Sequence, residues 1–326
     1  MRVALDALVT HCTDLLTGAG LPRAAAVEAV TALVDADLRG LSSHGVAMLP
    51  VYVDGLRSGG VSTGTVAAVV SDGGGFVLLD AGHALGQLTS AQAVRLVAER
   101  AGRNGVAAVG VRRAHHFGAA STWSVRLAEQ GFVGVALSNS APLMAAPGTA
   151  TPVVGNNPLS IAAVDRTGGV IVADLALSVG SVAKMRTTGK VPAGWALDPC
   201  GAPTRDLPTA LAGSLVPLGD GKGFGLAVLI EVLTGVLTGG PFGTSVSRFS
   251  ADPATPNNCA HLFLALDPRA VGTADAVADG VATLAATLPH VPGRARQALA
   301  AEQRHRGVEV PDAALDRLGW LPRGAR

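Results

Sequence analysis

The chain has 326 residues, of which 48% are hydrophobic and 15% are charged, and this composition excludes an intrinsically disordered protein. The formal net charge is +1, and the sequence contains no basic stripe or acidic tail, so we expect binding neither to nucleic acid nor to a membrane surface. The mean hydropathy is +0.40, but the most apolar stretch, 224–240, carries Glu231 at its centre. That stretch is also shorter than the roughly 20 residues that a bilayer requires. A buried core helix is therefore predicted there.

The cysteines are few, widely spaced and odd in number: Cys12, Cys200 and Cys259. Without a C-x-x-C pair they predict neither a disulfide framework nor a structural zinc site. The N-terminal apolar stretch is interrupted by Asp6 and Asp14, which indicates an amphipathic helix and not a signal peptide. We therefore expect a soluble protein in a reducing compartment, the cytoplasm.

The first 60 residues show helical periodicity. One apolar face is formed by Leu5, Leu8, Leu15 and Leu16, and a second by Val27, Val30, Leu33, Val34 and Leu38. Gly40 is a plausible end of the second helix, and Pro50 stands near the start of a third helix that carries Tyr52.

From about residue 66 strands and helices alternate, which is the pattern of an α/β protein. Strands are predicted at 66–70, 76–80, 106–111, 132–139, 159–164, 170–174 and 261–266. Helices are predicted at 88–101, 122–129, 223–237, 274–288 and 293–306.

The glycine-rich stretch 219–225 is the nearest approach to a dinucleotide-binding fingerprint. Its glycines alternate and do not match G-x-G-x-x-G, and Gly223 after Lys222 excludes a Walker A loop. The stretch predicts a phosphate-friendly entry to a helix, with Lys222 beside backbone amides. A glycine-rich turn with a solvated lysine is an equal alternative.

Two further motifs contain histidine. His44, preceded by Ser43 in a turn after a helix, is a candidate general acid, although an ordinary surface histidine is the alternative. His115 and His116 follow the strand at 106–111, and strand ends are where α/β sheets bind ligands. Adjacent histidines in a strand point to opposite faces, and no carboxylate or cysteine stands at ligand spacing, so we expect no metal.

Loops of small and amide residues at 137–142 and 155–158 suit hydrogen bonds to a ribose or an amide, with ordinary turn chemistry as the alternative. Taken in order, the segments resemble the malate/L-lactate dehydrogenase family, which has its own non-Rossmann fold. That family includes sulfolactate dehydrogenase, ureidoglycolate dehydrogenase, diketogulonate reductase and the piperideine- and pyrroline-2-carboxylate reductases. The collinear matching stretches cover nearly the whole chain: 37–59, 115–124, 137–148, 155–163, 174–184, 191–206, 217–239 and 261–268.

The resemblance implies a mixed-sheet cofactor-binding domain of residues 66–288 and a mostly helical domain built from residues 1–65 and 289–326. It implies a homodimer with the active site near the subunit interface. His44 would be the proton donor, Ser43 its relay partner, and His116 a second residue of catalysis or cofactor contact. The implied cofactor-binding residues are His116, Phe117, Gly118, Ala119, Ala120, Ser138, Asn139, Ser140, Asp174, Leu175, Ala176, Lys184 and Lys222.

Two positions that face the substrate depart from the family pattern. The arginine that grips the substrate carboxylate is replaced by Met48, and the threonine of the G-T-N-P segment is replaced by Asn156. Losing an arginine–carboxylate pair weakens binding, so we expect a cyclic imine, or a carbonyl in a larger apolar molecule, instead of an ordinary 2-oxo acid. Tyr52 is predicted to line this pocket. Arg39 or Arg57 is an alternative carboxylate anchor.

A third departure concerns the cofactor. Many members read Pro-Gly-Glu before the C-terminal helix, where the carboxylate suits a ribose 2′-hydroxyl; here Arg294 replaces the acid and Arg296 follows. Arginines favour a 2′-phosphate, so NADPH is expected in preference to NADH, and reduction is the expected direction. A solvated helix face is the alternative explanation.

The sequence thus predicts an NAD(P)H-dependent imine or carbonyl reductase acting on a small molecule. Two alternatives stay open. One is a conventional NAD-dependent 2-hydroxy-acid dehydrogenase, and the other is an inactive cofactor-binding scaffold, against which the retained Ser43 and His44 argue.

Overall fold

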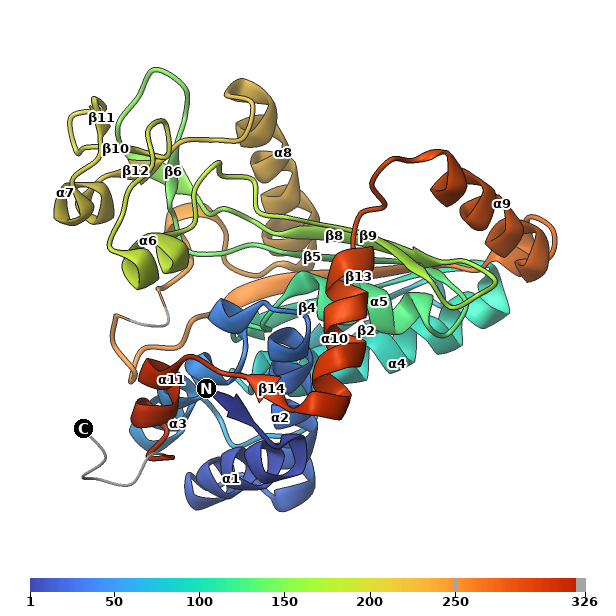
Figure 1. Ribbon diagram of the computed structural model, residues 1–326. Coiled ribbons are helices and arrows are strands. Elements are labelled where there is room, and N and C mark those ends of the chain that lie inside the picture. Colours follow the sequence, from blue (N-terminus) through green and yellow to red (C-terminus); the bar gives the residue numbers. More distant parts are fainter. Residues whose placement is uncertain (249–250, 321–326) are drawn as a thin grey trace.

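The computed structural model describes residues 1–248 and 251–320, and its centre is a seven-stranded mixed sheet in the order β2-β3-β4-β13-β5-β8-β9 (Figure 1). The strands are β2 (Ala68–Asp72), β3 (Phe76–Asp80), β4 (Val106–Ala114), β5 (Val133–Ser138), β8 (Leu159–Val164), β9 (Val170–Leu175) and β13 (Cys259–Leu266). In this sheet β3 and β4 pair in parallel, and the other neighbours are antiparallel. A Rossmann sheet is mostly parallel, so the prediction of a non-Rossmann mixed sheet is confirmed.

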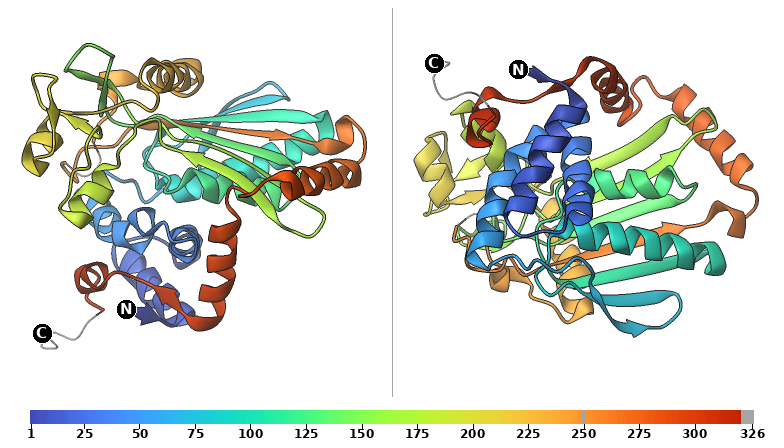
Figure 2. Two further views of the ribbon diagram at one scale, coloured as in Figure 1. Left: turned by 45° about the horizontal axis from the view of Figure 1, so that its top comes forward. Right: turned by 90° about the horizontal axis from the view of Figure 1, so that it is seen from below.

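Helices cover both faces of this sheet. Helices α4 (Gly86–Asn104) and α5 (Ala120–Ala128) lie on one face and α8 (Gly221–Glu231) on the other, as Figures 1 and 2 show. Their side chains and the inward residues of the strands form continuous apolar cores, in which Trp123 and Phe263 are completely buried. The central strands of the sheet are therefore mostly shielded from water, whereas the edge strand β2 is exposed at every residue.

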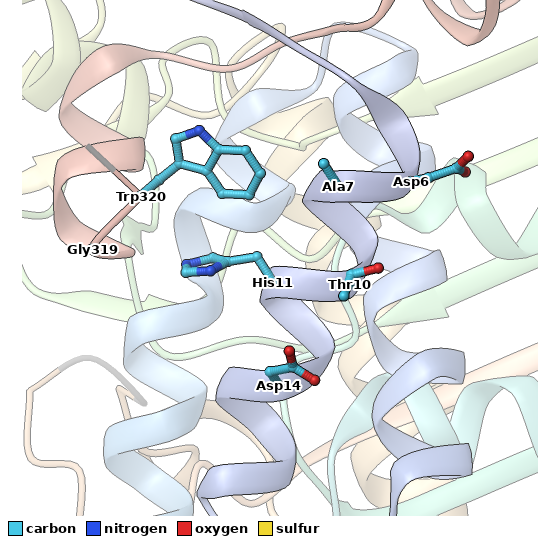
Figure 3. Close-up of a pocket in the computed structure, with 7 residues that line it drawn as sticks. All are labelled: Asp6, Ala7, Thr10, His11, Asp14, Gly319 and Trp320. Atoms are coloured by element: carbon cyan, nitrogen blue, oxygen red, sulfur yellow. The ribbon is translucent and has the colours of Figure 1, made fainter. Parts of the chain in front are cut away.

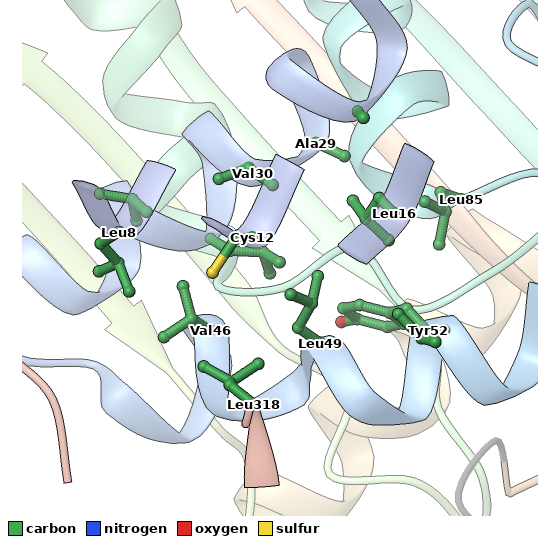
Figure 4. Packing of buried hydrophobic residues seen from close by; sticks show 14 of the residues in the cluster. Leu8, Cys12, Leu16, Ala29, Val30, Val46, Leu49, Tyr52, Leu85 and Leu318 are labelled. Carbon is green, nitrogen blue, oxygen red and sulfur yellow. The ribbon is translucent and has the colours of Figure 1, made fainter. Parts of the chain in front are cut away.

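Both ends of the chain build the helical part of the molecule. Helices α1 (Leu5–Gly18), α2 (Arg23–Leu38) and α3 (Leu49–Ser58) pack with α10 (Arg294–Arg306) and α11 (Asp312–Arg317). Strand β1 (Arg2–Val3) pairs with β14 (Val308–Glu309), which ties the two ends together. Figure 4 shows one cluster in which Leu8 and Leu16 of α1 meet Leu49, Tyr52 and the C-terminal Leu318. The domain limits given above stay a prediction.

A smaller lobe next to the main sheet was not predicted. Its five-stranded sheet consists of β6 (Met144–Ala145), β7 (Pro152–Val154), β10 (Ala196–Leu197), β11 (Pro203–Thr204) and β12 (Ser214–Leu215). Helices α6 (Val182–Thr188) and α7 (Leu207–Ala212) accompany it. Strands of two or three residues show no alternation in the sequence. These short strands are recognised only from their pairing with one another in the folded chain.

The helix predicted at 223–237 is correct in place but not in environment. After α8 the chain continues as a π-helical segment, η3 (Val232–Val236), and the inner side of this pair is buried. Its outer side exposes Leu229, Leu233 and Leu237, with exposed fractions of 58%, 41% and 54%. The prediction of a buried core helix is therefore wrong for the outer face, which none of the described residues covers. In the part of the chain that the structure describes, no helix is long and apolar enough to cross a bilayer.

The remaining elements connect these parts. Single 3₁₀ turns are η1 (Ser42–His44), η2 (Val46–Met48), η4 (Gly243–Ser245) and η5 (Pro268–Ala270), and helix α9 (Ala274–Thr287) follows β13. The predicted strand at 66–70 is shifted by two residues, and the helices predicted at 274–288 and 293–306 form within one residue of their expected limits.

Candidate active site

Ser43 and His44 lie in a tight turn between α2 and α3. The buried carboxylate of Asp37, near the end of α2, accepts a hydrogen bond from the backbone N–H of Val46 at 2.7 Å. This bond holds the start of η2 against α2 and so fixes the turn that carries His44. The Ser43 hydroxyl lies 2.9 Å from His44 Nδ1. The predicted relay pair is therefore in hydrogen-bond contact.

His116 lies next to His44 although the two are far apart in the sequence. The two imidazole rings stack with their centroids 5.8 Å apart and an interplanar angle of 27°. The Tyr52 hydroxyl, which comes from α3, lies 2.7 Å from His116 Nδ1. Tyr52 itself is completely buried. The structure thus gives Tyr52 the position of a support for His116, and its predicted contact with substrate stays a prediction.

The surroundings favour neutral imidazoles. Burial lowers the pKa of His44, and the nearby Asp174 carboxylate opposes that shift. Burial also lowers the pKa of His116 well below its ordinary range, and the adjacent His44 adds to this effect. Because the charged form of an imidazole loses its hydration in such a place, both rings are mainly uncharged near pH 7.

Residues 117–120, which follow His116, are small or buried. Gly118 has φ +84°, a backbone conformation that favours glycine, and a Cβ placed on it would make an ordinary contact at 3.7 Å with the backbone oxygen of His44. Phe117 is buried and stacks on His261 with centroids 4.4 Å apart. Ala119 and Ala120 are buried as well. Direct side-chain contact of Phe117 with a cofactor does not fit this burial, because the ring belongs to the core between α5 and the sheet.

Asp174 and the two predicted lysines are open to solvent. Asp174, on β9, accepts a hydrogen bond of 2.5 Å from the Ser121 hydroxyl at the start of α5. Lys184 is exposed and lies over the Trp195 ring, 5.5 Å from its centroid. Lys222 is exposed in the first turn of α8, and its role in binding phosphate stays a prediction. Leu175 is exposed and Ala176 follows it directly after the strand.

The predicted amide-rich loops lie against one another. The Ser140 hydroxyl donates to Asn156 Oδ1 at 3.1 Å, and the Ser140 N–H donates to Asn157 Oδ1 at 2.9 Å. Ser138 is buried and its hydroxyl lies 2.9 Å from His261 Nδ1, whereas Ser140 remains partly exposed. The structure therefore joins a predicted cofactor position, Ser140, to a predicted substrate position, Asn156.

Met48 is partly buried and packs against the helical core. Of the two alternative carboxylate anchors, Arg39 is almost fully buried, and its Nε donates to Asp35 at 3.0 Å. Arg57 is exposed in the last turn of α3. Arg39 is thus committed to a structural ion pair, and a substrate carboxylate would have to displace Asp35 to use it.

The two arginines of α10 lie apart from the histidines. Arg294 forms an ion pair with Asp165 in the turn between β8 and β9, and Arg296 donates to the backbone oxygen of Arg39 at 3.1 Å. The turn before Arg294 is nevertheless beside the site strand, because Pro292 O accepts the N–H of Val172 at 3.1 Å. Val172 precedes Asp174 by two residues on β9. The segment just before α10 therefore lies beside β9, the strand that carries Asp174.

Three residues of this arrangement were not predicted as functional: Asp37, Ser121 and Glu231. The sequence signal for Asp37 and Glu231 was an acidic residue within an apolar helix. Such a residue needs a hydrogen-bonding or charged partner when it is buried. Ser121 had no signal, because a serine in the first turn of a helix is common.

A surface pocket lies elsewhere, between α1 and the C-terminal segment (Figure 3). It is lined by Asp6, Ala7, Thr10, His11, Asp14, Gly319 and Trp320. The His11 ring meets Trp320 edge-on, with centroids 5.0 Å apart, and His11 Nε2 lies 2.8 Å from Leu318 O. Among residues 1–248 and 251–320, no group of three His, Cys, Asp or Glu side chains is placed to share a metal ion.

Comparison with known proteins places the chain in a family. The family described as malate/L-lactate dehydrogenase matches residues 3–319. The chain is 36% identical over 325 residues to the (2R)-3-sulfolactate dehydrogenase (NADP(+)) of Chromohalobacter salexigens, covering 97% of this chain and 96% of that protein. It is 33% identical over 273 residues to the ureidoglycolate dehydrogenase (NAD(+)) of Escherichia coli K12, covering 82% and 78%.

Solved structures agree in fold. The sulfolactate dehydrogenase from Methanocaldococcus jannaschii superposes with a TM-score of 0.88 at 28% identity, covering 98% of this chain and 95% of that one. The delta1-piperideine-2-carboxylate reductase from Pseudomonas syringae has a TM-score of 0.87 at 29% identity, covering 98% of both chains. The chain therefore belongs to the malate/L-lactate dehydrogenase family and is an NAD(P)-dependent oxidoreductase.

Proposed function

We propose that this oxidoreductase uses NADPH to reduce a C=N bond of a cyclic imine, or a C=O bond of a small molecule. The observation that carries the proposal is the stacked imidazole pair, with His44 bonded to Ser43 and His116 bonded to Tyr52. Reduction of either bond adds a hydride to carbon and a proton to the heteroatom. A bound nicotinamide supplies the hydride, so the chain has to supply the proton.

Ser43 and His44 suit that proton transfer. When the Ser43 hydroxyl donates to His44 Nδ1, the neutral ring carries its proton on Nε2. His44 can then give that proton to the substrate heteroatom while Nδ1 takes the serine proton, and the partly exposed Ser43 regains a proton from solvent water. This relay avoids a lasting imidazolium, which burial disfavours at His44. His116, held through its Nδ1 by Tyr52, completes the wall of the site.

The residues around this pair fit an elongated dinucleotide. Gly118 leaves open the space that a Cβ would fill near His44. Ser140, which is partly exposed, offers a further hydrogen-bonding group. Exposed Lys184 and Lys222 can take phosphate charge. Arg294 and Arg296 lie at the start of α10, beside β9, and support a preference for the 2′-phosphate of NADPH. Arg294 would have to exchange Asp165 for that phosphate.

The substrate proposal rests on Met48 and Asn156. Met48 cannot pair with a carboxylate, and Arg39 is occupied by Asp35. A pocket of this kind favours a less acidic or larger apolar substrate over pyruvate or oxaloacetate. A conventional 2-hydroxy-acid dehydrogenase remains the second candidate, because a relative is a sulfolactate dehydrogenase.

The test is a fluorescence titration with NADPH and NADH, followed by cofactor oxidation against a panel of cyclic imines and 2-oxo acids. We expect a higher kcat/KM with NADPH than with NADH. We also expect turnover of cyclic imines that carry no carboxylate. Rapid turnover of pyruvate or oxaloacetate would return the protein to 2-hydroxy-acid chemistry. A higher kcat/KM with NADH would remove the proposed role of Arg294 and Arg296.

We also propose that the protein is a cytoplasmic homodimer with its active site near the subunit interface. The support is the exposed apolar face of α8 and η3, which carries Leu229, Leu233 and Leu237 on one side. Lys222 and Glu231 belong to the same helix, so a partner bound to this face would lie close to the site.

A further inference from the structure

Glu231 is a buried carboxylate at the end of α8. Only 6% of the residue is exposed, and within residues 1–248 and 251–320 no Lys, Arg or His side chain forms an ion pair with it. A buried carboxylate without a cation needs several hydrogen-bond donors to be retained. Glu231 has three: Asn157 Nδ2 donates to Oε1 at 2.8 Å, and Asn139 Nδ2 and the Gly243 N–H donate to Oε2 at 3.1 and 3.2 Å.

An ionised carboxylate accepts hydrogen bonds and cannot donate them. Both asparagines must therefore turn their NH₂ groups toward Glu231, and their Oδ1 atoms point the opposite way. Asn139 Oδ1 accepts from the Ala260 N–H at 2.7 Å, on strand β13. Asn157 Oδ1 accepts from the Ser140 N–H at 2.9 Å. Glu231 shares this orienting role with two backbone oxygens: Ala227 O also accepts from Asn157 Nδ2 at 3.0 Å, and Pro241 O accepts from Asn139 Nδ2 at 2.9 Å. Together they fix which end of each amide reaches the loops of the site.

The consequence falls on Ser140. Its N–H donates to Asn157 Oδ1, and its hydroxyl lies within hydrogen-bond distance of two amide oxygens, Asn156 Oδ1 at 3.1 Å and Asn157 Oδ1 at 3.4 Å. With its proton directed inward, the Ser140 oxygen can offer the site only lone pairs. It then suits a ligand group that donates, such as a carboxamide NH₂ or a ribose hydroxyl of the cofactor.

We infer that Glu231 is a positioning residue, which acts through Asn157 to hold Ser140 as a hydrogen-bond acceptor for the nicotinamide cofactor. The inference rests on the proposed function in one respect, namely that Ser140 contacts the cofactor. Glu231 itself touches neither reactant. It acts by fixing the loops after β5 and before β8 in one relative position.

The test is a double-mutant cycle on the full-length protein with Glu231→Gln, Ser140→Ala and the combined variant. Glutamine keeps the shape but turns an NH₂ toward one asparagine, so the hydrogen bond between that asparagine and residue 231 is lost. The amide that holds Ser140 is then fixed less firmly. We expect each single variant to raise the Kd for NADPH by about tenfold, the value of one hydrogen bond. The combined variant should be no weaker than either single one, because both remove the same contact.

Asp267→Asn is the matched control. Asp267 is also a buried hydrogen-bonded carboxylate, but it follows the far end of β13, where it binds Arg269. This variant should lower the melting temperature and leave the Kd for NADPH unchanged. If Glu231→Gln does not fold, Asn157→Ala with Ser140→Ala gives a second cycle that removes the relay and spares the carboxylate.

The outcomes separate the two proposals. Independent, multiplying effects of Glu231→Gln and Ser140→Ala, or an unchanged Kd in Glu231→Gln, would overturn the positioning role while NADPH binding by the wild type still stands. If the wild type binds neither NADPH nor NADH, the proposed function fails and this inference fails with it.

Discussion

At the scale of single residues, the site depends on the surroundings of two imidazoles. Burial lowers the pKa of both His44 and His116, and each ring is held through Nδ1 by a hydroxyl, from Ser43 and Tyr52 respectively. The two rings are therefore alike in burial and in having a hydroxyl at Nδ1. Their difference lies in access to a proton relay, because the serine is partly exposed and the tyrosine is completely buried.

This difference predicts how the two histidines respond to substitution. His44→Ala should lower kcat by about 10²-fold or more, as expected for a lost general acid, and leave the Kd for NADPH nearly unchanged. Tyr52→Phe, which removes the hydroxyl that supports His116, should have a much smaller effect on kcat. Steady-state kinetics and fluorescence titration measure both. Full activity in His44→Ala would move the proton donor to His116, and loss of cofactor binding would argue for a structural role. An inactive scaffold would show no turnover even in the wild type.

Asp37 provides a second prediction, on stability. Burial raises its pKa from 3.8 to about 7, and the hydrogen bond from Val46 opposes that shift. Between these values the folded state holds a proton that the unfolded state has lost, so this group makes the protein less stable as the pH rises. From about pH 5 to about pH 8 the loss should be roughly 2 kcal/mol.

Asp37→Asn removes this titration and keeps an oxygen for the Val46 N–H. Urea unfolding at both pH values should therefore show a smaller fall in the free energy of unfolding for the variant than for the wild type. Asp267→Asn serves as the control, because Arg269 lowers the pKa of Asp267 and its charge is complete throughout this range. An equal fall in the wild type and Asp37→Asn would contradict the raised pKa.

At the scale of elements, the π-helical segment η3 joins the Glu231 network to the turn that follows it. A Cβ on Gly235 would lie 2.5 Å from Pro241 O and 3.0 Å from Asn139 Nδ2. The close approach brings Pro241 O within 2.9 Å of Asn139 Nδ2 as a hydrogen-bond acceptor. The irregular helix therefore positions backbone groups around the same amide that Glu231 holds.

Gly235→Ala should consequently destabilise the protein by about 1–3 kcal/mol, because backbone atoms have to move. Gly225→Ala, in an exposed part of α8 with no atom within 4 Å of the new Cβ, should instead be neutral or stabilising by up to about 1 kcal/mol. Chemical unfolding measures both. Equal changes in the free energy of unfolding for the two variants would show that the turn at Pro241 adjusts at no cost. The close packing of η3 would then not contribute to stability.

At the scale of the whole molecule, the exposed apolar face of α8 and η3 is the main departure from a self-contained monomer. Exposed side chains at Leu229, Leu233 and Leu237 repeat every four residues, so they lie along one side of the helix. Contiguous apolar surface of this kind is typical of protein interfaces. Phe242, with 53% of the residue exposed, follows the same segment.

We therefore expect sedimentation velocity to give a dimer for the wild type and a monomer for Leu233→Glu, since a buried unpaired charge is strongly unfavourable at an interface. Val271→Glu is the control, because Val271 is 85% exposed in a separate loop. A monomeric wild type, or a Leu233→Glu variant that remains dimeric, would exclude this face as the subunit interface.

The sequence by itself determined the α/β alternation, the helical ends and the family. Strands such as β3 and β8 appear where predicted because runs of apolar and β-branched residues mark them locally. Ser43, His44 and His116 could be singled out because few residue types perform acid–base chemistry near neutral pH. The departures at Met48 and Asn156 were likewise readable from the family pattern alone.

Only the tertiary structure decided which of these residues meet. Tyr52 and His116 are 64 positions apart, and Asn139 and Glu231 are 92 apart, and no periodicity in a sequence encodes such pairings. Burial of Phe117, pairing of Arg39 with Asp35 and exposure of the α8 face likewise depend on what packs against each side chain. The physical reason is that local patterns specify elements through backbone geometry, whereas pKa shifts, hydrogen-bond orientation and exposure arise from contacts between distant elements.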